Sequence, residues 1–152
     1  MKYDDASWHY GGDFPSHLPN EAGATHIAIF VAWCVLNGMA GDPHTGDGDD
    51  LLAKLKTRTI TPTQWFIAAC DAKFTDEDLT DEGNVFARAY YGAEGELASD
   101  PNAYVADYEK EFPDAGSLYE VPDTWSTYDR MAPRIARRLK RRSKPQWLRR
   151  WF

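Results

Sequence analysis

The sequence predicts an all-α or strongly helix-dominated fold, a compact single-domain helical bundle with a long N-terminal loop. The chain has 152 residues, of which 43% are hydrophobic and 27% charged, as is ordinary for one globular domain. Apolar residues recur mainly with the 3.6-residue period of helices, and strand signals are confined to one or two short edges. We expect residues 1–142 to form the helical domain and residues 143–152 to form a basic aromatic tail.

The first two segments predict the loop and the centre of the bundle. Residues 3–15 lack a sustained period and contain Gly11-Gly12 and Pro15, which favours a loop. Residues 24–36 are apolar almost all round, which is typical of a buried helix, and Asn37-Gly38 suits its end. At roughly 1.5 Å per residue this helix is about 20 Å long, shorter than a bilayer core of roughly 30 Å. A core helix is therefore expected, not a membrane span.

Capping signals predict the next two helices. Residues 50–56 begin with acids and end with lysines, which complements the helix dipole. Thr61 can cap the following helix, Pro62 suits its first turn, and Gln64 can complete a capping box.

Three helices are predicted in the second half of the chain. The first of them ends before Gly92, and the second starts at Asp100. The apolar stripe expected on the first is Val85, Phe86, Ala89 and Tyr90. Residues 117–121 suggest a short extended piece, and Pro133 should kink or divide the last helix.

Charge is distributed unevenly along the chain. Residues 1–129 contain 7 Lys or Arg against 24 Asp or Glu, a net charge of −17, whereas residues 130–152 carry 10 Lys or Arg and no acid. A body this acidic repels nucleic acid and should attract a basic partner. We expect the basic tail to fold back on the body or fray, with contact to an anionic membrane as the weaker alternative.

No metal site or cofactor is predicted. Cys34 and Cys70 lie in apolar helical patterns without ligand spacing, so they are expected to be reduced core thiols. Residues 42–50 lack the spacing of an EF-hand and should form a solvated loop. The histidines have no helical metal-binding spacing, although they remain candidate ligands or bases if they gather in space: His9, His17, His26 and His44.

Acidic and aromatic residues of two segments are the candidate partner-binding residues. Tyr and Trp are enriched in binding hot spots, and clustered acids favour a basic partner. The candidates are Asp4, Asp5, Trp8, His9, Tyr10, Asp13, Asp76, Glu77, Asp78, Asp81 and Glu82. The alternatives are that the aromatics pin the loop to the core and that the acids are simply solvated.

The motif YDDASWHYGGDFP at residues 3–15 is joined by four shorter ones. These are AGATHI at 22–27, ITP at 60–62, DAKF at 71–74 and DEGN at 81–84. With them, the chain resembles an uncharacterised bacterial domain family over roughly residues 3–140. The family brings no activity, catalytic residue or cofactor, but small bacterial proteins of this kind often resemble immunity proteins of toxin systems. The end after about residue 140 departs from the pattern.

The leading hypothesis is a protein-binding module, an immunity-like inhibitor that neutralises a cognate bacterial toxin through an acidic, aromatic surface. We expect it to be monomeric when free and, without a secretory signal at its start, cytoplasmic. The absence of a catalytic motif favours a protein that is not an enzyme. The alternative is a small hydrolase that uses His9 or His26 with aspartates of the N-terminal loop.

Overall fold

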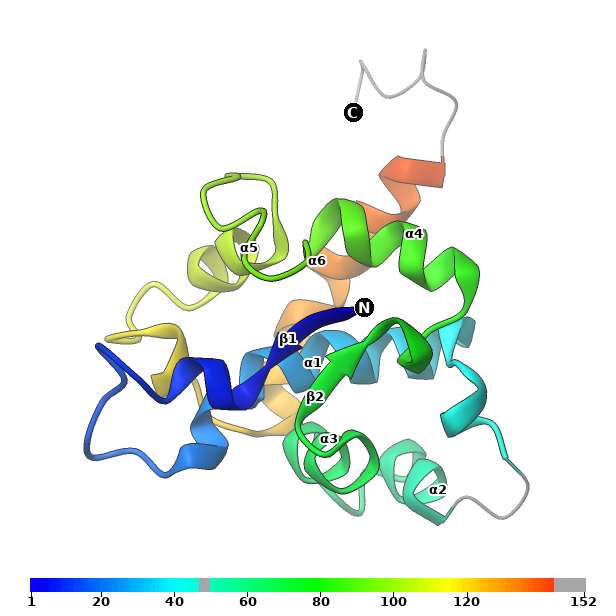
Figure 1. Cartoon of the computed structure of the whole chain (residues 1–152), viewed down its shortest axis with the longest axis horizontal. Helices are drawn as coiled ribbons and strands as arrows, with labels where there is room; N and C mark the ends of the chain where they lie inside the picture. The colour runs from blue at the N-terminus through cyan, green and yellow to red at the C-terminus, as the bar shows by residue number, and fades with distance from the viewer. Residues whose placement is uncertain (47–49, 144–152) are drawn as a thin grey trace.

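The computed structural model describes residues 1–46 and 50–143, and its helices gather around α1 (Thr25–Cys34) (Figure 1). All residues of α1 are buried, because a helix that is apolar all round has no face suited to water. It packs against α3 (Pro62–Cys70) and α6 (Trp125–Ser143). The helix-dominated fold and the buried central helix are confirmed.

The end of α1 also follows the prediction. The chain continues through one turn of π-helix, Val35–Met39, in which Gly38 has a φ of 83°. This left-handed conformation suits glycine, which has no Cβ to clash with the following carbonyl. Here the helix stops and the chain leaves the core.

Helix α2 (Asp50–Lys56) has an acid in its first turn and lysines in its last, and a capping box explains the start of α3. The Thr61 hydroxyl accepts from the Gln64 backbone N–H at 3.1 Å, and the Gln64 side chain accepts from the Thr61 N–H at 2.9 Å. These two bonds satisfy donors that the first helical turn leaves unpaired. The predicted capping box is confirmed.

The inward face of α4 (Asp81–Tyr90) differs from the expected stripe. Val85 is 63% exposed, and the interior positions are taken by Phe86, Ala87 and Tyr90. The prediction assumed a stripe that begins at Val85, whereas the helix is rotated so that Phe86 and Tyr90 stack on each other. Gly92 ends the segment with a φ of 81°, as expected.

The structure corrects the start of α5 (Tyr104–Glu111), which was expected at Asp100. The Asp100 carboxylate accepts from the Asn102 N–H at 2.8 Å and so stabilises a turn before the helix. Residues 117–121 are also not extended, because Leu118–Glu120 form a 3₁₀ turn.

Helix α6 runs unbroken through Pro133, so the expected division there is wrong. Its buried seam of Thr127, Tyr128, Met131 and Ile135 holds the helix together on both sides of the proline. The expected tail lies outside the described residues from position 144 onward.

The long N-terminal loop is the main error of the sequence analysis. The chain instead begins with β1 (Lys2–Asp5), which pairs antiparallel with β2 (Lys73–Thr75), and continues in a 3₁₀ helix, Ala6–His9 (Figure 1). The ring of Tyr3 stacks on Phe74 with centroids 4.5 Å apart. A strand of four residues, paired with a segment about seventy positions away, leaves no periodic signal in the sequence.

Two smaller expectations can be compared with the described residues. Cys34 and Cys70 are free thiols, as predicted, and burial raises the pKa of both. Among the helices of the described ranges, none combines the length and the apolar character required to cross a bilayer.

Candidate functional site

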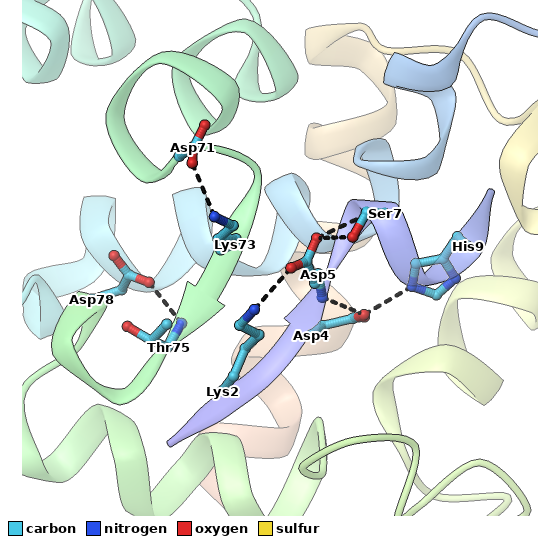
Figure 2. A network of polar contacts seen from close by, with 9 residues as sticks. All are labelled: Lys2, Asp4, Asp5, Ser7, His9, Asp71, Lys73, Thr75 and Asp78. Atoms are coloured by element: carbon cyan, nitrogen blue, oxygen red, sulfur yellow. Dashed lines mark hydrogen bonds and ion pairs between the residues drawn. The ribbon is translucent and has the colours of Figure 1, made fainter.

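The end of β1 places the side chain of Asp4 in the interior, where every one of its neighbours is a donor. Its Oδ1 accepts from the Asp5 N–H and from His9 Nε2, each at 2.8 Å (Figure 2). Its Oδ2 accepts from the Tyr91 hydroxyl at 2.5 Å. Burial alone would raise the pKa of Asp4, but its contacts with the imidazoles of His26 and His9 outweigh this and hold the pKa well below its usual range. Asp4 is therefore an anion inside the fold.

His9 is held from both sides. The 3₁₀ turn after β1 brings its imidazole back over Asp4, and its Nδ1 lies 2.7 Å from the Tyr119 hydroxyl. A carboxylate only accepts hydrogen bonds, so Nε2 carries a proton, and the second hydrogen bond of the ring joins Nδ1 to the Tyr119 hydroxyl. The result is a chain of three groups, from carboxylate to imidazole to phenol.

His26 enters from the first turn of α1 and is only 1% exposed. Its Nε2 lies 3.6 Å from Asp4 Oδ2, and its Nδ1 is buried without a hydrogen-bond partner. Burial lowers the pKa of His26 because it disfavours the charged imidazolium, which predicts a neutral ring. The rings of His9 and His26 meet edge to face with centroids 4.7 Å apart.

A cavity of about 410 Å³ opens beside Asp4, His9 and His26, and we call it the N-terminal pocket. Its walls are mostly apolar, and two exposed acids, Glu94 and Glu109, also line it. The apolar residues that matter for its shape are Trp8, Leu97, Val105 and Leu118. The pocket therefore combines a carboxylate and imidazole floor with hydrocarbon walls and further negative charge.

A second group of titratable side chains lies between β2 and the turn after α1. His44 Nε2 is 2.8 Å from Asp78 Oδ1 and 3.7 Å from Cys70 Sγ. Asp78 also accepts from the Thr75 N–H at 2.8 Å, which caps the 3₁₀ turn Asp76–Asp78 (Figure 2). His44 and Asp78 are both buried. The group fastens three segments of the chain to one another.

Three of the predicted partner-binding residues are not on the surface. Asp4, Asp5 and Asp78 are buried, and their carboxylates serve internal donors. Asp5, for example, accepts from the Ser7 N–H at 2.9 Å and pairs with Lys2 at 2.9 Å (Figure 2). For these three we correct the prediction, because an acid that folds inward has its oxygens occupied before a partner arrives.

The other candidates are accessible but form two groups. Because Lys2 pairs with Thr75, the acids that follow β2 lie beside the start of β1, whereas the aromatic segment follows the end of β1. Trp8 is 49% and Tyr10 38% exposed, and Asp13 is exposed near them. In the acidic group, Asp76 binds the N-terminal amine at 3.0 Å, and the exposed members are Glu77, Asp81 and Glu82.

Several site residues are not among the predicted partner-binding residues. Tyr91 and Tyr119 orient Asp4 and His9, and Glu94 and Glu109 line the pocket. A buried tyrosine usually needs a partner for its hydroxyl, which is a general signal and does not identify that partner. These contacts span up to 110 positions and depend on the tertiary fold.

Comparison with known proteins gives a family and no characterised relative. No curated protein and no solved structure matches the chain significantly. A family model matches residues 2–121, which include the Asp4, His9 and His26 cluster, all the residues of the N-terminal pocket, and none of α6. The chain therefore belongs to the family described as "Domain of unknown function (DUF7832)".

Proposed function

We propose that the chain is a protein-binding module, an immunity-like inhibitor that neutralises a basic cognate partner by receiving one of its cationic side chains in the N-terminal pocket. The observation that carries the proposal is the composition of this pocket, with apolar walls, two exposed acids and the half-exposed Trp8. Lysine and arginine have hydrocarbon stems and charged ends, which match such a site. The Trp8 ring accepts a cation within this chain, because Lys2 Nζ lies 5.5 Å from its centroid, and a partner's cation could bind the ring in the same way.

The charge of the whole chain supports the same partner. A net charge of −17 over residues 1–129 attracts a basic protein over long distances and increases the rate of encounter. The exposed acids Glu77, Asp81 and Glu82 contribute to this field from the other side of the small sheet. In this proposal the pocket determines how long the complex lasts, and the general charge determines how fast it forms.

The first experiment is to crosslink and purify the full chain from its native cells in moderate salt and to identify any stoichiometric partner by mass spectrometry. The purified partner is then used for binding kinetics with two matched double variants. Glu94→Lys with Glu109→Lys reverses the acids of the pocket, and Asp81→Lys with Glu82→Lys makes the same change of charge away from it.

We expect the pocket variant to raise the dissociation rate by about 10- to 100-fold, as the loss of a central anchor does. The distant variant should slow association by only a few-fold, and more at low salt. Equal effects of the two variants would remove the role of the pocket. The absence of a stoichiometric partner would contradict the binding-module proposal itself.

A hydrolase remains the second candidate, because Asp4 and His9 are arranged like an orienting carboxylate and a general base. Nδ1 of His9 is engaged by Tyr119, so water activation requires this hydroxyl to move aside. Tyr119→Phe should then preserve or increase turnover of ester, amide or phosphoester substrates, and His9→Ala should abolish it. Lack of turnover by the wild type, or turnover that survives His9→Ala, would exclude this candidate.

A further inference from the structure

His26 is buried in the fold, and one nitrogen of its imidazole lacks a hydrogen-bond partner. Its ring is 1% exposed, Nδ1 has no partner, and Nε2 lies 3.6 Å from Asp4 Oδ2. A separation of 3.6 Å exceeds the range of a normal hydrogen bond between nitrogen and oxygen. Buried polar groups in folded proteins are usually satisfied, and leaving one unpaired costs free energy. The 3.6 Å gap between Nε2 and Asp4 leaves this nitrogen available to a ligand that the two groups would share, whereas the unpaired Nδ1 points away from Asp4.

The neighbouring donor atoms have the spacing of metal ligands. One oxygen of Asp4, one nitrogen of His9 and one nitrogen of His26 lie within 4.8 Å of one another. Zinc binds imidazole nitrogen and carboxylate oxygen at about 2.0–2.2 Å, which places two tetrahedral ligands roughly 3.3 Å apart. The observed separations are 2.8 Å from His9 Nε2 to Asp4 Oδ1 and 3.6 Å from His26 Nε2 to Asp4 Oδ2, so each imidazole faces a different oxygen of the carboxylate. Small side-chain shifts would bring both close to the tetrahedral value.

The surroundings of two of the three ligands, His9 and Asp4, are also suitable. Metal-bound histidines usually donate their second N–H to a neighbouring group, and bound carboxylates are themselves hydrogen bonded. His9 has the Tyr119 hydroxyl at Nδ1, and Asp4 has the Tyr91 hydroxyl and the Asp5 N–H. If a metal occupied Nε2 of His9, its proton would move to Nδ1, and the Tyr119 oxygen would accept it.

We propose that Asp4, His9 and His26 form a binding site for a divalent transition metal of the zinc class, with the remaining coordination position facing the N-terminal pocket. Two histidines and one carboxylate, from β1, the turn after it and α1, are a ligand set that both zinc and iron(II) sites use. The pocket provides room for water or a small ligand at the open position. The site would also tie the N-terminal segment to the central helix.

The His44, Cys70 and Asp78 group is the competing location, because its donor atoms are equally close. The two groups differ in one useful respect, since only the second contains a thiol. Cobalt(II) bound by a thiolate shows a strong sulfur-to-metal charge-transfer band, which a site built from nitrogen and oxygen lacks. Co²⁺ is therefore a probe that distinguishes the two locations in the intact protein.

The experiment uses the full chain without an affinity tag, freed of metal with EDTA and then dialysed. Zn²⁺ is titrated by calorimetry with the thermal midpoint followed in parallel, and Co²⁺ by visible absorption. We expect one ion per chain, a higher thermal midpoint because the ion binds the folded state, and Co²⁺ bands without thiolate charge transfer. His9→Gln should weaken binding at least about 100-fold, since loss of even an outer partner costs 10- to 100-fold.

Two further variants complete the test. Cys70→Ser is the matched control and should bind as the wild type does. Tyr119→Phe retains all three ligands and should lower affinity about tenfold without changing the Co²⁺ spectrum. Failure of the wild type to bind Zn²⁺ would overturn the proposal, as would a thiolate band lost in Cys70→Ser. No protein partner is needed, so the result is independent of the binding-module proposal.

Discussion

Two pairs of aspartate and histidine in this protein have the same geometry and different surroundings. His9 binds Asp4, and His44 binds Asp78, both at 2.8 Å. Each aspartate also accepts from a backbone N–H. The Cys70 thiol lies next to His44 in the Asp78 pair, whereas Asp4 also accepts from a tyrosine hydroxyl and faces a second imidazole beside a cavity. A buried pair of carboxylate and imidazole therefore serves, by itself, only to hold segments of the chain together. It becomes a candidate site where an unpaired group and space for a ligand adjoin it.

The two pairs also fasten different parts of the chain. The Asp78 pair joins the turn after α1 to the turn after β2. The Asp4 network joins β1 to the end of α4 through Tyr91 and to the turn before α6 through Tyr119. More donors depend on Asp4, so we expect it to matter more for stability.

The largest effect should follow Asp4→Ala. Removal of this carboxylate leaves the Tyr91 hydroxyl, the His9 N–H and the Asp5 N–H without their acceptor. Breaking a buried, hydrogen-bonded charge network in this way costs about 3–5 kcal/mol. Urea denaturation at pH 7 measures the change in the free energy of unfolding.

The control is Asp78→Ala, which removes the acceptor of His44 and of the Thr75 N–H. Its cost should be lower, about 2–3 kcal/mol, because fewer donors are left unsatisfied. Equal decreases in the free energy of unfolding for the two variants would show that both pairs stabilise the fold to the same extent. Asp4 would then not contribute more than Asp78.

A third buried aspartate, Asp107, is bound by an arginine and can be compared with the two aspartates bound by histidine. Asp107 is buried between α5 and α6, where Arg138 binds both of its oxygens at 2.8 and 2.9 Å and the Tyr90 hydroxyl binds one of them at 2.8 Å. Burial alone would raise the pKa of Asp107, but the bonds from Arg138 and Tyr90 outweigh it and lower the pKa. Arg138 stays protonated throughout, so only the acid side of the pH profile should respond.

Because the folded pKa of Asp107 lies below the unfolded value of about 3.9, its contribution is fully present above that value and is lost as the pH falls through the folded pKa. Asp107→Asn should therefore destabilise the protein by about 1–3 kcal/mol at pH 7 and by less near pH 3. Urea denaturation at both pH values tests this. A difference that does not change with pH would contradict the assignment.

The smallest effect on stability is expected for Trp8→Ala. Trp8 is 49% exposed, so its loss should change the free energy of unfolding by only about 0.5 kcal/mol. Trp65 is fully buried, and Trp65→Ala should cost about 3–5 kcal/mol. Thermal denaturation of the two variants compares the loss of stability at a residue of the pocket wall with the loss at a residue of the core. A large loss from Trp8→Ala would make this residue a structural clamp.

The elements predicted well are those with local causes. The Thr61 capping box, the end of α1 at Gly38 and the buried apolar helix each follow from interactions within a few residues. The failures depend on distant contacts. Val85 was assigned to the wrong face because the rotation of α4 depends on what packs against it, and the first strand was missed because its partner is β2.

The candidate site was likewise predicted only in part from the sequence. The sequence singled out Asp4, His9 and His26, the first two in the opening motif, and the hydrolase alternative combined His9 or His26 with aspartates of the N-terminal segment. It could not show that Asp4 is buried or that Tyr91 and Tyr119 orient the cluster. Nor could it separate the exposed acids from the internal ones, because Asp78 and Glu77 are neighbours in sequence with opposite environments.

By itself, the sequence determined a helix-dominated chain with a strongly acidic body, the apolar helix at its centre and several helix boundaries, because composition, period and capping are local properties. Only the tertiary structure decided which aspartates face inward, which histidines meet and where a cavity lies beside them. The physical reason is that a buried charge is tolerated only where donors from separate segments converge on it, and this convergence exists only once the chain has folded.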